Sequence, residues 1–200
     1  MTIHSYTTLR AATPRDARTL AKLIDIAGEG IPNWLWGQMA GDGQTPLDAG
    51  EARARRDSGG FSWKNAIVAE HDAEVAAMML GYPIAEPTDE DRAGVRGLPE
   101  PVRPFVELEH QSAGTFYVNA LAALPGRRGR GLGSALLRAA QDKARASGIG
   151  RMSIQVFDQN TGAVRLYERL GYTITDSRPV LSHPCQPYYD GRVLLLTKAI

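Results

Sequence analysis

The segment that most constrains the fold runs from Thr115 to Gly148, where an apolar run meets a glycine- and arginine-rich stretch and then an amphipathic pattern. The apolar run, TFYVNALAAL, predicts a buried strand, and the pattern after the glycines predicts a helix that ends near Gly148. A strand that turns into a helix leaves unpaired N–H groups at the helix start, where the peptide dipoles add partial positive charge. The sequence therefore predicts an anion-binding turn, and we expect its ligand to be a pyrophosphate.

The turn carries the residue types that such a site needs. Glycines remove side chains that would keep a ligand from the backbone, and arginines add mobile positive charge around it. The glycines are Gly129, Gly131 and Gly133, and the arginines are Arg127, Arg128 and Arg130. The alternative is a helix that merely starts with glycines and exposes its arginines, although helix starts normally favour Ser, Thr, Asp or Asn.

Two common phosphate-binding motifs do not match this turn. A P-loop requires GxxxxGK[ST], but Gly126 and Gly131 are followed by Leu132 instead of lysine. A dinucleotide fingerprint requires GxGxxG, and the third glycine is missing whether the pattern starts at Gly129 or at Gly131. Both motifs are therefore excluded.

Strand and helix patterns alternate along the rest of the chain and predict a mixed α/β fold. The segment 31–60 mixes helical pieces with glycine and proline and is not assigned, and 83–114 is expected to be an exposed excursion with a short helix in PFVELEH. The remaining expected elements are a strand before Pro14, a helix that opens at Asp16, a hairpin with its turn near 71–74, a helix in 160–171, and strands in 151–157, 172–178 and 191–199. We expect one domain over residues 1–200.

Composition narrows the class of protein. The apolar fraction is 43%, the formal net charge is +1, and no apolar run reaches about 18 residues, so we expect neither a nucleic-acid partner nor a membrane span. The start of the chain lacks the pattern of a secretory signal, and the single Cys185 cannot form an internal disulfide, so we expect a cytoplasmic protein. His183 and Cys185 do not have metal-ligand spacing, and no metal is expected.

The stretch RRGRGLG contains R-x-x-G-x-G at Arg128, Gly131 and Gly133, directly after the predicted buried strand. This pattern resembles that of the GNAT N-acetyltransferases. The resemblance implies a mixed, mostly antiparallel sheet flanked by helices, a turn that holds the pyrophosphate of acetyl-CoA, and a preceding strand that splays to admit the pantetheine arm. The implied cofactor-binding residues of this part are Leu121, Ala122, Ala123, Arg128, Gly129, Arg130, Gly131, Leu132, Gly133 and Ser134. Ala123 stands where the family often has valine.

A second segment, DQNTGAVRLYERLGY, is similar to the family pattern N-x-x-A-x-x-x-Y-x-x-x-G-[FY] at Asn160, Ala163, Tyr167, Gly171 and Tyr172. The spacing keeps its first three motif residues on one helix face. The resemblance implies that Asn160 bonds the pantetheine or phosphate region, that Ala163 lets the arm pass, and that the Tyr167 hydroxyl reaches the CoA sulfur. The alternatives are an N-cap for Asn160, a C-terminal cap for Gly171 and a core aromatic for Tyr167.

Acetyl transfer to an amine requires a base, because a lysine-like amine has a pKa of about 10.4. Glu107 is the base that we expect, with Glu109 or His110 as other options, Asn119 to position a water, and solvated surface as the alternative for the acidic side chains. Backbone N–H groups of 121–123 are candidates for stabilising the oxyanion. Tyr167 is the expected acid that protonates the departing thiolate.

The resemblance thus implies an enzyme that transfers the acetyl group of acetyl-CoA to an amine of a small molecule or a protein. The alternative is a protein of the same fold that binds CoA only to sense or regulate, although Tyr167 argues for activity. Acyl-chain length and oligomeric state stay open, with a homodimer as one option. Aromatic candidates for the wall of the acceptor site, each with core or edge packing as the alternative, are Trp34, Trp36, Tyr82, Tyr117, Tyr188 and Tyr189.

Overall fold

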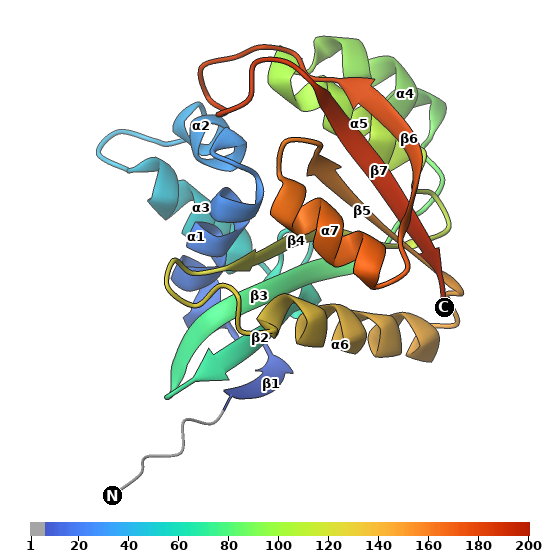
Figure 1. Cartoon of the computed structure of the whole chain (residues 1–200). Coiled ribbons are helices and arrows are strands. Elements are labelled where there is room, and N and C mark those ends of the chain that lie inside the picture. Colours follow the sequence, from blue (N-terminus) through green and yellow to red (C-terminus); the bar gives the residue numbers. More distant parts are fainter. Residues whose placement is uncertain (1–6) are drawn as a thin grey trace, which may run out of the picture. The chain divides into compact units, whose positions relative to one another are not determined.

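Seven strands form one sheet within residues 7–200, the part of the chain that the computed structural model describes (Figure 1). The strands are β1 (Thr7–Ala11), β2 (Ala66–His71), β3 (Glu74–Pro83), β4 (Phe116–Ala123), β5 (Arg151–Phe157), β6 (Thr173–Pro179) and β7 (Arg192–Ala199). Their order in the sheet is β1-β2-β3-β4-β5-β7-β6. β4 and β5 are parallel, whereas β1 with β2, β2 with β3, β5 with β7 and β6 with β7 are antiparallel. The predicted mixed, mostly antiparallel sheet is confirmed.

Residues 7–200 also contain seven α-helices. These are α1 (Ala17–Ala27), α2 (Ile31–Gly37), α3 (Pro46–Ala54), α4 (Asp89–Gly94), α5 (Arg103–His110), α6 (Leu132–Ala146) and α7 (Thr161–Arg169). Short 3₁₀ segments span Pro14–Asp16, Trp63–Asn65, Val95–Gly97 and Glu100–Val102. The helices expected in PFVELEH, after the glycine turn and in 160–171 are confirmed.

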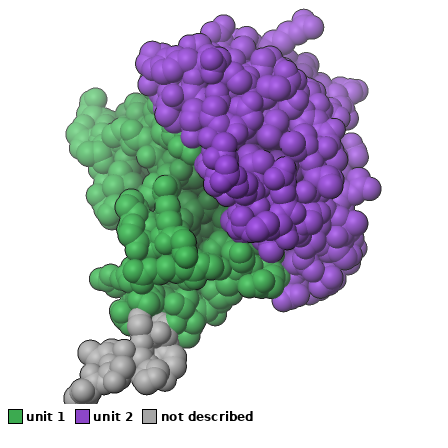
Figure 2. Space-filling model, in the orientation of Figure 1, with its two compact units in different colours: residues 1–81, 120–140 green, residues 82–119, 141–200 purple. Residues whose placement is uncertain are grey.

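The chain divides into two compact units, which Figure 2 shows in different colours. The first contains residues up to 81 together with 120–140, and the second contains 82–119 and 141–200. Strand β4 and helix α6 each contribute residues to both units. The expectation of one domain over the whole chain stays a prediction.

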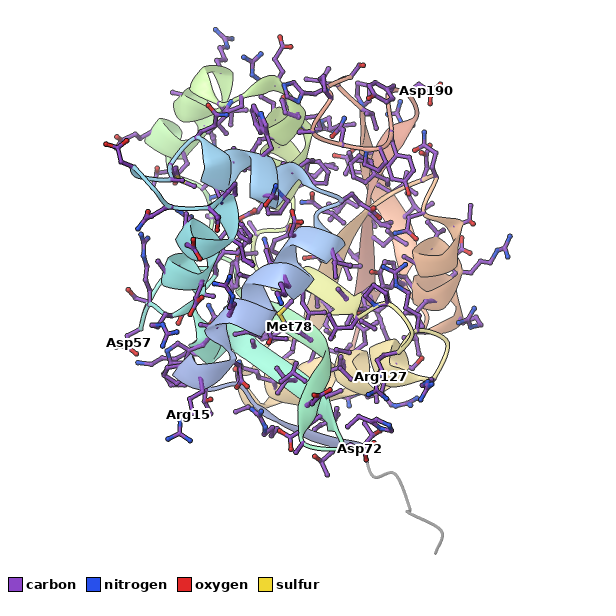
Figure 3. All side chains as sticks on the ribbon, turned by 90° about the vertical axis from the view of Figure 1, so that its left-hand side faces the viewer. Arg15, Asp57, Asp72, Met78, Arg127 and Asp190 are labelled. Carbon is purple, nitrogen blue, oxygen red and sulfur yellow. The ribbon has the colours of Figure 1, made fainter. Side chains whose placement is uncertain are left out.

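The first unit begins with a strand and helix as the sequence predicts. Thr13 and Asp16 form a capping box, in which the Thr13 backbone N–H donates to Asp16 Oδ2 at 2.7 Å, and α1 follows at once. The Arg10 guanidinium also holds this carboxylate, with 2.8 Å between Nη1 and Oδ2. Residues of α1 at helical spacing are fully buried, and so is Met78 of β3, in the region where Figure 3 shows α1 crossing the strands.

The hairpin of β2 and β3 turns at Asp72 and Ala73, which have φ of +52° and +63°. Positive φ at both central residues gives the turn a twist that matches the twist of the two strands. The register pairs His71 with Glu74 next to this turn, so the predicted turn position is confirmed. Figure 3 shows Asp72 at this end of the hairpin.

The second unit places α5 against the sheet face that carries Gln155 of β5. Gln155 Nε2 donates to the carbonyl oxygen of Phe105 at 3.0 Å, and the rings of Phe105 and Phe157 meet edge to face at 5.3 Å. On the same face the hydroxyls of Thr115 and Ser153 are 2.6 Å apart and buried. The return of the 83–114 excursion is therefore a helix anchored on the sheet.

Candidate functional site

The glycine-rich turn between β4 and α6 follows a left-handed backbone. Gly129 and Gly131 have φ of +74° and +77°, values that residues with a Cβ atom rarely adopt. A Cβ added at either position would meet no atom within 4 Å. The backbone conformation, and not tight packing, therefore requires glycine here, and the space beside the backbone is open to a ligand.

Helix α6 starts directly after this turn without a side-chain cap at the residue before it. The Gly131 carbonyl accepts the first intrahelical bond from the Ala135 N–H at 3.0 Å, and glycine has no side chain that could cap the first turn. The first amides of a helix, here those of Leu132, Gly133 and Ser134, lack intrahelical acceptors. The helix start thus offers N–H donors and partial positive charge to an anion.

The arginines of the turn add charge that the protein does not neutralise. Arg128 and Arg130 are exposed and Arg127 is half-buried. Across residues 7–200, none of the three forms an ion pair with a carboxylate. Figure 3 shows Arg127 at the outer edge of this loop. Three guanidinium groups are therefore available to an anionic ligand.

Within the second unit, β4 and β5 form a parallel ladder. Its register contains Phe116 with Met152, Tyr117 with Ser153 and Val118 with Ile154. β4 nevertheless continues to Ala123 and β5 to Phe157. Within the second unit, the ladder therefore ends just before Asn119. The resemblance implies a splay of this same strand, and that splay stays a prediction.

The ends of helix α7 support the simpler interpretations of two motif residues. Asn160 Oδ1 accepts from the Ala163 N–H at 3.2 Å, so Asn160 is the N-cap. Gly171 has φ of +86° and follows the last turn, as a C-terminal cap does. These roles are confirmed, and they leave a further contact of Asn160 or Ala163 with a cofactor as a prediction.

Tyr167 of α7 is 4% exposed, and its ring lies 6.0 Å from that of Tyr172. Burial, and to a smaller extent Tyr172, raises the pKa of Tyr167. No residue of the described chain forms a hydrogen bond with its hydroxyl group. The phenol is therefore neutral and keeps its proton available for a partner.

Glu107, the expected base, is engaged by an arginine. Arg178 Nε of β6 lies 2.9 Å from Glu107 Oε2, and Arg178 also pairs with Asp176 at 2.8 Å. The Glu107 side chain is 44% exposed. The geometry thus agrees with the surface alternative for Glu107, and its catalytic role stays a prediction.

Glu109, two residues further along α5, is in a different environment. It is mostly buried, burial raises its pKa, and no side chain of residues 7–200 pairs with it. After burial, the Glu109 charge is the next cause that raises the pKa of both Tyr82 and Tyr117. The second unit therefore contains a half-buried carboxylate whose charge reaches two phenols.

Other residues singled out in the sequence divide between core and surface. Trp36 is 3% exposed and belongs to the core of the first unit, whereas Tyr189 is 59% exposed. Tyr188 contacts the Phe157 ring at a centroid distance of 4.9 Å, and His183 Nδ1 accepts from the Cys185 N–H at 3.1 Å.

In the described part of the chain, no group of three or more His, Cys, Asp or Glu side chains converges as metal ligands would.

None of the helices between residues 7 and 200 combines the length and apolar character that crossing a bilayer requires.

Comparison with known proteins shows the family. The model of the acetyltransferase (GNAT) family matches residues 29–172. The chain therefore belongs to the GNAT acetyltransferase family.

One sequence relative is the mycothiol acetyltransferase of Renibacterium salmoninarum, which is 37% identical over 75 residues. This match covers 38% of the chain and only 22% of the length of that relative.

Solved structures show the same fold. Polyamine N-acetyltransferase of Drosophila melanogaster, an enzyme that forms N-acetylagmatine, matches with a TM-score of 0.71 and 15% identity over 98% of this chain and 100% of that one. YncA of Salmonella typhimurium, a putative acetyltransferase solved with acetyl-CoA, matches with a TM-score of 0.61 and 20% identity over 98% of this chain and 94% of that one.

Proposed function

We propose that the chain is an acetyl-CoA-dependent N-acetyltransferase that acts on an amine of a small molecule or a protein. The observation that carries this proposal is the turn before α6, where Gly129 and Gly131 have left-handed backbone, open space beside them and unpaired arginines around them. A pyrophosphate fits such a turn, because it accepts hydrogen bonds from first-turn amides and charge-assisted bonds from guanidinium groups. The YncA complex with acetyl-CoA supports this choice of acyl donor.

We assign acetyl-CoA binding to the residues that the family motif marks. Arg128–Ser134 would hold the pyrophosphate, and Asn160 and Ala163 would contact the pantetheine arm. Backbone N–H groups of Leu121–Ala123 would donate to the oxygen that becomes negative during transfer. Coenzyme A supplies the activated acetyl group as a thioester, and no metal is assigned.

Tyr167 is the residue that we assign as the acid. Burial raises its pKa, so the phenol carries its proton at neutral pH. A thiolate that is formed in similarly buried surroundings is a stronger base than the free thiolate, whose acid has a pKa of about 8.5. The unbonded hydroxyl of Tyr167 then has a group to protonate.

Binding of CoA by purified protein, followed by calorimetry, tests the assignment of the turn. Arg128→Gln should weaken CoA binding by about 10–150-fold, because a charge-assisted hydrogen bond contributes roughly 1.5–3 kcal/mol. Arg15→Gln is the matched control. Arg15 is also an exposed arginine, but it lies between β1 and α1 and not in the glycine turn. Absence of binding at millimolar CoA would refute the proposal.

Release of free thiol from acetyl-CoA in the presence of an amine panel tests the transfer itself. Polyamines, amino acids, aminoglycosides and peptides cover the main classes of acceptor. Tight CoA binding without acceptor-dependent thiol release would favour the CoA-binding sensor over the enzyme. A cytoplasmic location, a homodimer and the absence of nucleic-acid partners stay predictions.

A further inference from the structure

Five side chains of the second unit form a group that the acetyl-CoA motif does not include. We call it the acceptor cluster, and it consists of Tyr82, Glu109, Tyr117, Asn119 and Gln155. It combines two aromatic rings with a carboxylate and two carboxamides. Its arrangement follows from the sheet and from helix α5.

The strands place part of the cluster on one face. Tyr117 and Asn119 are two residues apart on β4 and therefore point to the same side. The parallel register sets Tyr117 beside Ser153, so Gln155, two residues further on β5, shares this face. The hydrogen bond from Gln155 Nε2 to the carbonyl oxygen of Phe105 places α5 over it.

Helix α5 directs Glu109 toward the same face. Phe105 and Glu109 are four residues apart and lie on one side of the helix, and the Phe105 ring contacts Phe157 of β5. The phenols of Tyr82 and Tyr117 lie within the range of the Glu109 charge, which raises the pKa of both.

The two tyrosines supply the aromatic surface of the cluster. Their rings meet edge to face with 6.0 Å between centroids, and Asn119 Nδ2 donates to the Tyr82 hydroxyl at 3.4 Å. Tyr117 is buried, whereas Tyr82, Glu109 and Asn119 are each partly exposed. The polar side chains of the cluster are therefore not sealed off from solvent.

The described part of the chain supplies no cation to this cluster. No residue between 7 and 200 forms an ion pair or hydrogen bond with the side chain of Glu109. The basic side chains of the two strands that contact α5 are engaged elsewhere: Arg178 with Glu107 and Asp176, Arg192 with Ser177, and Lys198 with Gln141. The net charge of the cluster is negative whenever Glu109 is ionised.

The cluster also holds a hydrogen-bond acceptor that lacks a donor. Gln155 Oε1 is buried, and no described residue donates to it. Buried acceptors are normally satisfied, so an unsatisfied one points to a donor that the chain does not provide. A ligand with N–H groups supplies such a donor, and a protonated amine also supplies the missing positive charge.

We propose that the acceptor cluster binds the substrate as a small cationic primary amine and that Glu109 is the catalytic base; this rests on the N-acetyltransferase activity proposed above. Glu109 takes one proton from the ammonium nitrogen, whose lone pair then forms the C–N bond to the acetyl carbon as the C–S bond breaks. Tyr167 gives its proton to the departing sulfur and regains one from the new amide nitrogen. Glu109 releases its proton to water, so one proton is produced for each amide formed.

The cluster selects against a carboxylate next to the reacting amine. An α-carboxylate would lie close to Glu109, and like charges in a partly buried site repel. Aromatic rings, in contrast, favour a cation. Between an amino acid and its decarboxylated counterpart, the amine without the carboxylate is therefore the better acceptor.

Steady-state kinetics at saturating acetyl-CoA tests the selectivity. The acceptors are the pairs lysine and cadaverine, arginine and agmatine, and phenylalanine and phenethylamine. In the lysine–cadaverine and arginine–agmatine pairs, we expect the kcat/KM of the decarboxylated member to be at least about tenfold higher than that of the amino acid. Equal values, or a preference for the amino acids, would overturn the assignment of the cluster while leaving acetyl transfer itself intact.

Variants of Glu109, with a variant of Glu100 as control, test the assignment of the base. Glu109→Gln should lower kcat about 100-fold or more, the usual contribution of a general base, with CoA affinity unchanged by calorimetry. Glu100→Gln, an exposed glutamate of the same excursion, is the matched control and should keep kcat within about threefold. Glu109→Asp should restore part of the rate, which separates base chemistry from misfolding.

Full acceptor-dependent activity in Glu109→Gln would overturn the assignment of Glu109. A 100-fold loss in Glu107→Gln would then make Glu107 the base instead. If wild-type protein binds CoA and acetylates amines in that case, only the inference about Glu109 fails. If wild-type protein does not bind CoA, the proposed function itself fails.

Discussion

The ring of Trp36 on α2 lies directly against the backbone of Gly50 on α3. A Cβ atom added at Gly50 would stand 2.5 Å from Cε3 and Cζ3 of the indole. Trp36 is 3% exposed and Gly50 is buried, so neither side can move away into solvent. Glycine is required at position 50 because the indole occupies the space of a side chain.

Gly50→Ala should therefore destabilise the protein by about 1–3 kcal/mol, the usual cost of overpacking. The free energy of unfolding from urea titrations measures this. Gly94→Ala on α4 is the matched control, because its new Cβ would meet no atom within 4 Å and alanine favours helix. Unchanged stability in Gly50→Ala would show that the indole can shift at little cost.

Gly129→Ala should weaken CoA binding about tenfold or more, because alanine disfavours the left-handed backbone of the turn and its Cβ would enter the space assigned to the ligand. Gly148→Ala provides a control with the same backbone problem, since φ there is +72° and the added Cβ is also free of contacts. Both variants should lose about 1 kcal/mol or more of stability. Equal CoA affinity in the two variants, by calorimetry, would argue against a ligand at the turn.

Tyr167→Phe should lower kcat by about 10–100-fold and change the affinity for CoA little, because the variant keeps the buried ring and loses only the proton donor. Tyr172→Phe removes a phenol from the neighbouring ring, whose hydroxyl donates to Met152 Sδ at 3.6 Å. This control should keep most of its activity. An unchanged kcat in Tyr167→Phe would remove the acid assignment.

Asp48 should make the stability of the first unit sensitive to acid. Hydrogen bonds from Thr45, and then from Arg18, lower its pKa from 3.8 to about 2 in the folded state. A lowered pKa gives a stabilising contribution that is complete above pH 3.8 and is lost as the pH falls through about 2.

The melting temperature measured between pH 2 and pH 5 tests this linkage. Asp48→Asn should flatten the dependence across that window, because the amide does not titrate. Asp42→Asn, at an exposed carboxylate near the same helix, should keep the slope of the wild type. A slope that is the same in Asp48→Asn and wild type would contradict the assigned pKa.

Much of the fold was predictable from short stretches of sequence. The hairpin turn at Asp72 and Ala73, the capping of α7 by Asn160 and the end of that helix at Gly171 all depend on conformational preferences of a few neighbouring residues. The left-handed glycine turn before α6 also depends on local preferences of this kind. Such preferences act wherever the chain is, so the pattern alone indicates them.

The candidate base shows where local pattern stops being informative. Glu107 and Glu109 are two residues apart in one short helix, and nothing in PFVELEH distinguishes them as bases. The difference comes from Arg178, 71 residues from Glu107 in the sequence, and from the burial of Glu109 near Tyr82 and Tyr117. Similarly, the sequence makes Trp36 a candidate for the acceptor wall, whereas its contact with Gly50 shows that it belongs to the core.

The sequence by itself determined most of the elements and their order, the glycine turn before α6 and the family, but not the helices α2 and α3 in 31–60. Only the tertiary structure decided which carboxylate is ion-paired and which is half-buried without a side-chain partner. Backbone preferences are local, because they depend on sterics and hydrogen bonds within a few residues. The protonation state and reactivity of a side chain depend on desolvation and on charges that distant segments bring near it.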